Sequence, residues 1–120
     1  MAWVEVERKR TKLPVGGVSV TKAGRGRLDI GAATVRTWNL GKFDSVDIFQ
    51  DDKHPHLLAF RMMKGGEGRF KVSRRDDKTA VISCRAILKK AGAKCGRYRL
   101  SRDLSVQNFF TLDTSVMLND

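Results

Sequence analysis

The sequence predicts a single α+β domain, rich in β-strand, in which two ββαββ units share one core. Three observations lead to this fold class. Apolar and polar residues alternate with the period of two that half-buried strands show, and a short helical segment follows a strand pair in each half of the chain. The same apolar pattern then returns 52 positions later. A chain of 120 residues has the length of one ordinary domain.

The first unit is predicted over residues 18–63, after an N-terminal arm of residues 1–17. Pro14 and the Gly16-Gly17 pair mark the break between them. The predicted elements are strands 18–21 and 27–30, a helix over 32–40, and strands 46–49 and 57–60. Gly41 is expected just past the end of the helix.

The second unit is predicted over residues 70–113, between a Gly-rich joint at 64–69 and a C-terminal tail at 114–120. Its predicted elements are strands 70–73 and 80–82, a helix over 84–91, and strands 98–100 and 108–112. Ser83 is the expected N-cap of the helix and Gly92 is expected to end it.

A shift of 52 positions superimposes the two units without a gap. It places Val18 on Phe70, Val20 on Val72 and Phe60 on Leu112. Identities are few, so the interpretation rests on the apolar pattern. A unit of about 45 residues is too small to bury much surface alone. We therefore expect residues 18–113 to form one pseudo-twofold domain.

The charge of the chain indicates a polyanionic partner. The formal net charge is +11, and every charged residue is basic from Arg8 to Arg27 and again from Arg85 to Arg102. Solvated surfaces usually mix both signs, so such stretches favour nucleic acid. The alternatives are a basic protein whose charge only aids solubility and a protein that binds an anionic membrane surface.

The composition also bears on location and cysteine chemistry. No apolar run approaches the roughly 20 residues of a membrane span, and the N-terminus carries acidic residues where a signal peptide is apolar. We expect a cytoplasmic, nucleoid-associated protein. Cys84 and Cys95 are expected to be reduced thiols, with a nucleophile or a redox switch as the alternative.

The segment Gly26 to Leu40, followed by a polar loop and Asp44 to Asp52, resembles the AbrB-like swapped-hairpin family, which includes AbrB and SpoVT regulators, MazE-type antitoxins and MraZ. Gly26-Arg27-Leu28 and Ile30 match its motif, whereas Gly31 stands where Pro is common and Asn39 where Gly is common. The resemblance implies a swapped-hairpin β-barrel, in tandem form as in MraZ, that binds duplex DNA and regulates transcription.

The resemblance assigns DNA contacts to Arg25, Arg27 and Arg36, and the basic stretch adds Lys22. Arg25 and Arg27 are candidates for pairing with guanine, or for touching phosphate only. In the second half, Asp77 stands at the position that matches Arg25, and Thr79 at the position that matches Arg27. A symmetric palindromic DNA site is therefore in doubt. The cations of the second half would bind from other positions: Arg74, Arg75, Lys78, Arg85, Lys89 and Lys90.

Several alternatives stay open. RNA or single-stranded DNA could stack on Trp3 or Phe43. His54 and His56, beside Asp51 and Asp52, could bind a metal, although the turn is also simply polar. An antitoxin-like or phage-type accessory protein would instead bind an acidic protein.

Catalytic and cofactor motifs are lacking in the sequence, so neither an enzyme nor a cofactor is expected. The protein is expected to be a monomer or a homodimer. Copies would pair through the Trp3–Val6 segment as an edge strand or through the tail from Val106 to Leu118.

Overall fold

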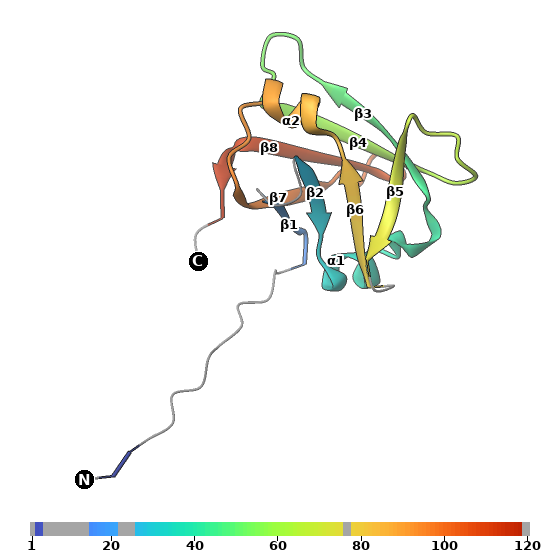
Figure 1. Cartoon of the computed structure of the whole chain (residues 1–120). Helices are drawn as coiled ribbons and strands as arrows, with labels where there is room; N and C mark the ends of the chain where they lie inside the picture. Colours follow the sequence, from blue (N-terminus) through green and yellow to red (C-terminus); the bar gives the residue numbers. More distant parts are fainter. Residues whose placement is uncertain (1, 4–14, 22–25, 76–77, 119–120) are drawn as a thin grey trace.

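The computed structural model of the chain describes residues 2–3, 15–21, 26–75 and 78–118. Over these residues it has eight strands, two short α-helices and one 3-10 helix (Figure 1). The elements are β1 (Gly17–Thr21), β2 (Arg27–Ile30), α1 (Ala32–Thr37), η1 (Leu40–Lys42), β3 (Ser45–Gln50), β4 (Leu57–Met63), β5 (Phe70–Arg75), β6 (Thr79–Ser83), α2 (Arg85–Lys90), β7 (Gly96–Arg102) and β8 (Phe109–Met117). Each of the eight predicted strands is present, and the β-rich fold class with two short helices is confirmed.

The strands close into an antiparallel barrel in the order β1-β2-β6-β5-β3-β4-β8-β7. Sequential strands form hairpins, and every hairpin lies between two strands from the other half of the chain. The hairpin β1–β2, for example, is flanked by β7 and β6, and β5–β6 is flanked by β3 and β2. The backbone hydrogen bonds that close the barrel therefore tie the two halves together, and closure leaves the sheet without open edges.

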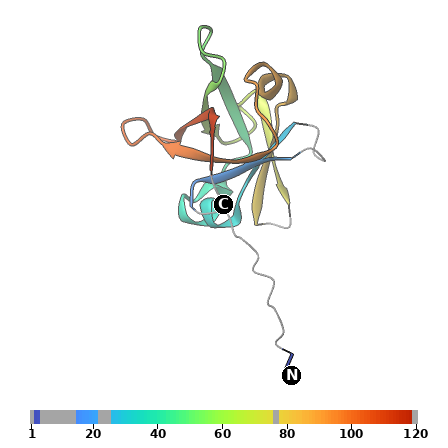
Figure 2. The same ribbon diagram turned by 90° about the vertical axis from the view of Figure 1, so that its left-hand side faces the viewer.

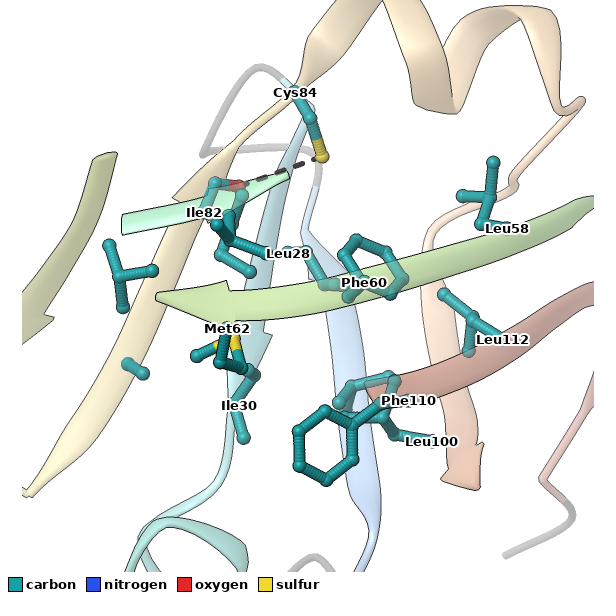
Figure 3. Close-up of a cluster of buried hydrophobic side chains, with 14 of the residues drawn as sticks. Leu28, Ile30, Leu58, Phe60, Met62, Ile82, Cys84, Leu100, Phe110 and Leu112 are labelled. Carbon is teal, nitrogen blue, oxygen red and sulfur yellow. Dashed lines mark hydrogen bonds between the residues drawn. The ribbon is translucent and has the colours of Figure 1, made fainter. Parts of the chain in front are cut away.

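The core fills the inside of the barrel with side chains from both halves (Figure 3). Alternate residues point inward, as the period of two requires. Leu28 and Ile30 do so on β2, and Leu58, Phe60 and Met62 on β4. Each such aliphatic or aromatic side chain contributes roughly 1.5–3 kcal/mol on full burial. Buried Tyr98 keeps its hydroxyl satisfied by donating to the Lys94 carbonyl at 2.6 Å.

The first helix is shorter than predicted. It ends at Thr37 rather than at residue 40, because Asn39 adopts a left-handed conformation with φ of 51°. Asn tolerates this region better than most residues and so stops a helix as Gly does. The chain then makes the 3-10 turn η1, which contains Gly41, so the expected placement of Gly41 just past the helix end is wrong.

The second helix begins later than predicted. Ser83 is the last residue of β6, and Cys84 takes the N-cap position without a capping hydrogen bond from its side chain. The expected N-cap at Ser83 is therefore wrong, because the pairing of β6 with β2 continues through the Arg27–Ser83 pair. Gly92 ends the helix in a left-handed conformation, with φ of 68°, as predicted.

The last strand is longer than predicted. β8 continues through Met117, past residue 113, after an irregularity in its pairing with β7 between Tyr98 and Leu100. The buried Thr114 hydroxyl lies 3.0 Å from the Ala91 carbonyl oxygen, which holds this extension against the chain that follows α2. Of the predicted N-terminal edge strand, residues 4–6 lie outside the described residues.

Candidate nucleic-acid interface

Gly26, the residue before β2, packs directly against the start of α2. Gly26 has a φ of 84°, and a Cβ on it would lie 2.7 Å from the Arg85 Cα. The Gly26 carbonyl also accepts a hydrogen bond from the Cys84 backbone N–H at 3.4 Å. Only glycine allows both this conformation and this close approach. The contact joins the two basic stretches of the sequence at one end of the barrel.

The helix α2 buries one side and exposes its cations. Leu88 is buried in the core and Ile87 packs against it. Arg85, Lys89 and Lys90 are exposed. We define the α2 end as these three residues together with Arg27, which pairs with Ser83 in the neighbouring strand.

The position of Arg85 is electrostatically unfavourable for the helix itself. The first turn of α2 has no acidic residue, and Arg85 lies there, next to the positive end of the helix dipole. Its spacing of four residues from Lys89 adds like-charge repulsion of a few tenths of a kcal/mol. An anion bound at the α2 end would offset both effects.

Arg27 lies on the outer face of β2 but is half-buried, as is Asp29 two residues further on. Arg27 Nε and Asp29 Oδ1 are each shielded from solvent, and the structure gives neither atom a hydrogen-bond partner. A buried polar atom without a partner costs about 1–3 kcal/mol. Arg27 therefore differs from the freely exposed arginine that the sequence alone suggests.

The other end of the barrel holds a second cationic group. Arg36 and Lys78 line a cleft of about 460 Å³ together with Val35, Asn39 and Gly41. The Arg74 guanidinium packs against Gly41, since a Cβ there would be 3.0 Å from its terminal nitrogens. We define the α1 end as Arg36, Arg74 and Lys78. Figures 1 and 2 show α1 and α2 at opposite ends of the barrel.

The structure thus divides the predicted site residues between two places. Arg27, Arg85, Lys89 and Lys90 come together at the α2 end, and Arg36, Arg74 and Lys78 at the α1 end. Lys22 and Arg25 lie outside the described residues, and of Arg75 only the backbone is described. Lys42, which the sequence reasoning missed, lies in η1 with its Nζ 5.2 Å from the centre of the Phe43 ring.

Several carboxylates are occupied by local hydrogen bonds. The Asp47 carboxylate accepts from the Arg69 backbone N–H and from Arg61, and these bonds hold its pKa below the usual value. Asp51 accepts from the backbone N–H groups of His54 and Lys53, which lowers its pKa in the same way. Both carboxylates therefore stay ionised at neutral pH, and each is engaged in hydrogen bonds with the residues named above.

The rings of His54 and His56 lie 5.8 Å apart, edge to face, and the described part of the chain has no group of three or more His, Cys, Asp or Glu placed to hold a metal. Burial raises the pKa of the Cys84 thiol to about 11, so it is protonated at neutral pH. Cys95 is exposed, and both cysteines are free.

No helix among the described residues is long and apolar enough to cross a membrane. The chain was compared with protein-family models, curated proteins and solved structures, and none of them matches it.

Proposed function

We propose that this protein binds duplex DNA, as a transcriptional regulator of the AbrB-like swapped-hairpin type, and that its α2 end makes the main contacts. The observation that carries the proposal is the packing of Gly26 on Arg85. Because of it, Arg27 at the start of β2 and the basic helix α2 lie beside each other at one end of the barrel. Catalysis plays no part in this proposal.

The strand order supports the swapped-hairpin assignment. In that family the two ββαββ units interlock, and here every hairpin lies between strands of the other half. An exchange of β1–β4 with β5–β8 leaves the cyclic strand order unchanged. This is the arrangement expected of a tandem duplication that has closed on itself.

The registers support the 52-residue repeat. The β2–β6 pairs include Asp29–Val81, and the β4–β8 pairs include Ala59–Thr111; the partners in each of these two pairs are 52 positions apart. A twofold axis through the barrel would pass between the partners of both pairs.

Other registers agree with the same repeat, with two exceptions. The pair Val18–Tyr98 in β1–β7 becomes, after the shift, the pair Phe70–Val46 in β5–β3, and both pairs are present. The hairpin β5–β6 departs from the shift by two residues, and the Tyr98–Met117 pair of β7–β8 departs from it at the irregularity in that hairpin. The turn of β5–β6 is shorter: three residues separate Arg75 from Thr79, whereas five separate Thr21 from Arg27.

The two ends of this pseudo-twofold are unequal. The positions that match Arg85, Lys89 and Arg27 are Ala33, Thr37 and Thr79. At the α1 end, Asp76 and Asp77 also precede Lys78 in the sequence, whereas the stretch from Arg85 to Arg102 has no acidic residue. We expect the α2 end to dominate and the preferred DNA site to be non-palindromic.

In this proposal the exposed cations of the α2 end neutralise backbone phosphates. Each neutralised phosphate releases condensed counterions, so the logarithm of the affinity falls with that of the salt concentration by about 0.9 per contact. Base recognition would fall to Arg25 and Arg27. A bidentate arginine–guanine pair is worth roughly 1–3 kcal/mol of discrimination.

The test is a salt titration with three probes: random duplex DNA, single-stranded DNA and mixed tRNA. We expect the tightest binding to the duplex, with a steep negative salt slope. No duplex binding at about 50 mM salt, where several phosphate contacts bind strongly, would overturn the proposal. A preference for tRNA or single strands would replace it with the RNA or single-stranded DNA alternative.

An acidic protein partner is the second candidate, as for an antitoxin-like or phage-type accessory protein. The inequality of the two ends favours this candidate, because recognition of a palindromic DNA site would need two equal ends. A tagged protein would then capture an acidic partner that survives nuclease treatment. Loss of all captured material after nuclease would exclude this candidate.

A further inference from the structure

A groove on the outer surface of the barrel is apolar, in contrast to the basic ends. Strands β4 and β8 form its floor, β3 and β7 lie on its two sides, and its volume is about 750 Å³. Its lining includes three exposed apolar side chains, Phe49, Leu57 and Val116. A contiguous apolar surface with a polar rim marks an interaction site.

The lining of the groove also carries charges of both signs. Arg99 lines it from β7, Asp113 from β8, and Asp51 from the end of β3. Hydrogen bonds from Ser115 hold the pKa of Asp113 below its usual value, and the N–H groups of His54 and Lys53 do the same for Asp51. Both carboxylates are therefore ionised at neutral pH. An occupant that matches this lining presents apolar side chains together with a positive and a negative charge.

The loop between β7 and β8 presents this combination. We define the hairpin tip as residues 102–107. Leu104 is 87% exposed there and Val106 is 47% exposed. Arg102 and Asp103 precede them and supply one charge of each sign. Figure 2 shows this hairpin, in orange, projecting from the barrel.

The hairpin tip is held away from the groove of its own chain. The Asp103 carboxylate accepts hydrogen bonds from the Ser105 N–H at 2.9 Å and the Ser105 hydroxyl at 2.6 Å, which fix the turn. The Asn108 carbonyl accepts a hydrogen bond from the Met62 N–H at 2.9 Å, so the tip lies beside the end of β4. Leu57, in the groove, begins β4 and is five positions earlier, roughly 17 Å along the strand. A tip fixed in this way does not cover the groove beside it.

We propose that the groove binds the hairpin tip of a second copy of this chain, and that the exchange is reciprocal. A twofold axis midway between tip and groove brings each tip to the groove of the other copy and closes the assembly as a dimer. Leu104 and Val106 then cover the apolar floor. Arg102 and Asp103 meet opposite charges in the groove, so the contact is complementary in both signs. This inference is independent of nucleic-acid binding.

The first test places a glutamate on each side of the contact. Leu104→Glu changes the tip and Val116→Glu changes the groove, both at exposed positions. Trp3→Glu is the matched control, because Trp3 is 91% exposed and belongs to neither the tip nor the groove lining. Light scattering with size exclusion over a concentration series should show a wild-type dimer. Its dissociation constant should rise about tenfold or more in the first two variants and stay unchanged in the control.

The same series contains the outcomes that contradict the proposal. A wild-type chain that stays monomeric throughout would overturn it, as would a dimer that survives both substitutions. Loss of the dimer in Trp3→Glu would place the N-terminal segment at the interface and would equally overturn the proposal.

Mixing the variants separates a lost contact from a lost fold. The Leu104→Glu chain keeps its groove and the Val116→Glu chain keeps its tip, so together they form one exchange contact that neither forms alone. Native mass spectrometry should show the mixed dimer in excess over both homodimers. A mixture without this excess would show that tip and groove do not meet.

Cross-linking locates the contact directly. In a Cys95→Ser background, which leaves only the buried Cys84 thiol, a Leu104→Cys chain is mixed with a Val116→Cys chain and oxidised gently. The mixture should form disulfide-linked dimers in much higher yield than either chain alone. Equal yields in the mixture and in the separate chains would contradict the proposal.

Discussion

Asp29 of β2 lies directly opposite Val81 of β6, and the two residues are 52 positions apart in the chain. A half-buried carboxylate therefore faces a buried valine on the outside of the barrel, where Asp29 Oδ1 has no hydrogen-bond partner. The proposed pseudo-twofold would pass between these two side chains. Under the 52-residue repeat, Asp29 and Val81 occupy equivalent positions in the two halves. The two halves therefore differ here by an aspartate in place of a valine.

Replacing Asp29 with valine should stabilise the protein. Asp29→Val removes an unsatisfied buried oxygen and creates a valine pair across two neighbouring strands, so we expect a gain of about 1 kcal/mol in the free energy of unfolding. Urea denaturation measures this. Asp47→Val is the control, because Asp47 accepts hydrogen bonds from Arg61 and the Arg69 N–H, and it should lower stability. A loss of stability in Asp29→Val would mean that this carboxylate has an essential partner.

Gly26→Ala should be costly because Gly26 packs against the start of α2. The added Cβ would lie 2.7 Å from the Arg85 Cα, on a backbone with φ of 84°. Gly66 has a φ of 69° but no atom within 4 Å of such a Cβ, so Gly66→Ala isolates the conformational cost. We expect about 1–2 kcal/mol for Gly66→Ala and clearly more for Gly26→Ala, measured by thermal and urea unfolding. Equal costs would contradict the close packing of Gly26 on α2.

The two thiols should differ in reactivity. Cys84 is buried, with its pKa raised to about 11, and Cys95 is exposed. At pH 8, a thiol reagent such as Ellman's reagent should modify one thiol per folded chain quickly and the second only on unfolding. Cys95→Ser should abolish the fast reaction and Cys84→Ser should leave it unchanged. Fast modification of both thiols would show that the end of β6 opens readily.

The alternation of apolar residues was sufficient to predict the strands and the β-rich character of the fold. It could not predict where the first helix ends, because that depends on the left-handed backbone of Asn39. It could not predict where the second helix begins, because Ser83 pairs with Arg27, which is far away in the chain. The extension of β8 was missed for a related reason. Its polar Thr114 is buried through hydrogen-bond distances to the Ala91 and His56 carbonyls, which no local pattern reveals.

The sequence indicated which residues could form the candidate site, but not how they are arranged in space. Charge counting identified the cations of both halves, yet it could not divide them between two ends of a barrel. That division depends on Gly26 meeting Arg85 and on Gly41 meeting Arg74, which are contacts between residues distant in sequence. The half-buried state of Arg27 is likewise a property of the closed barrel.

The most direct test of the central claim compares charge removal at the two ends of the barrel. Duplex-DNA affinity would be measured over a salt series for wild type, for Arg85→Ala/Lys89→Ala at the α2 end and for Arg36→Ala/Arg74→Ala at the α1 end. Each pair removes two positive charges, so total charge is matched. Our account predicts that the α2-end variant binds about tenfold more weakly or worse and loses about two units of salt slope, while the α1-end variant changes much less. Wild-type affinity and slope in the α2-end variant would contradict it.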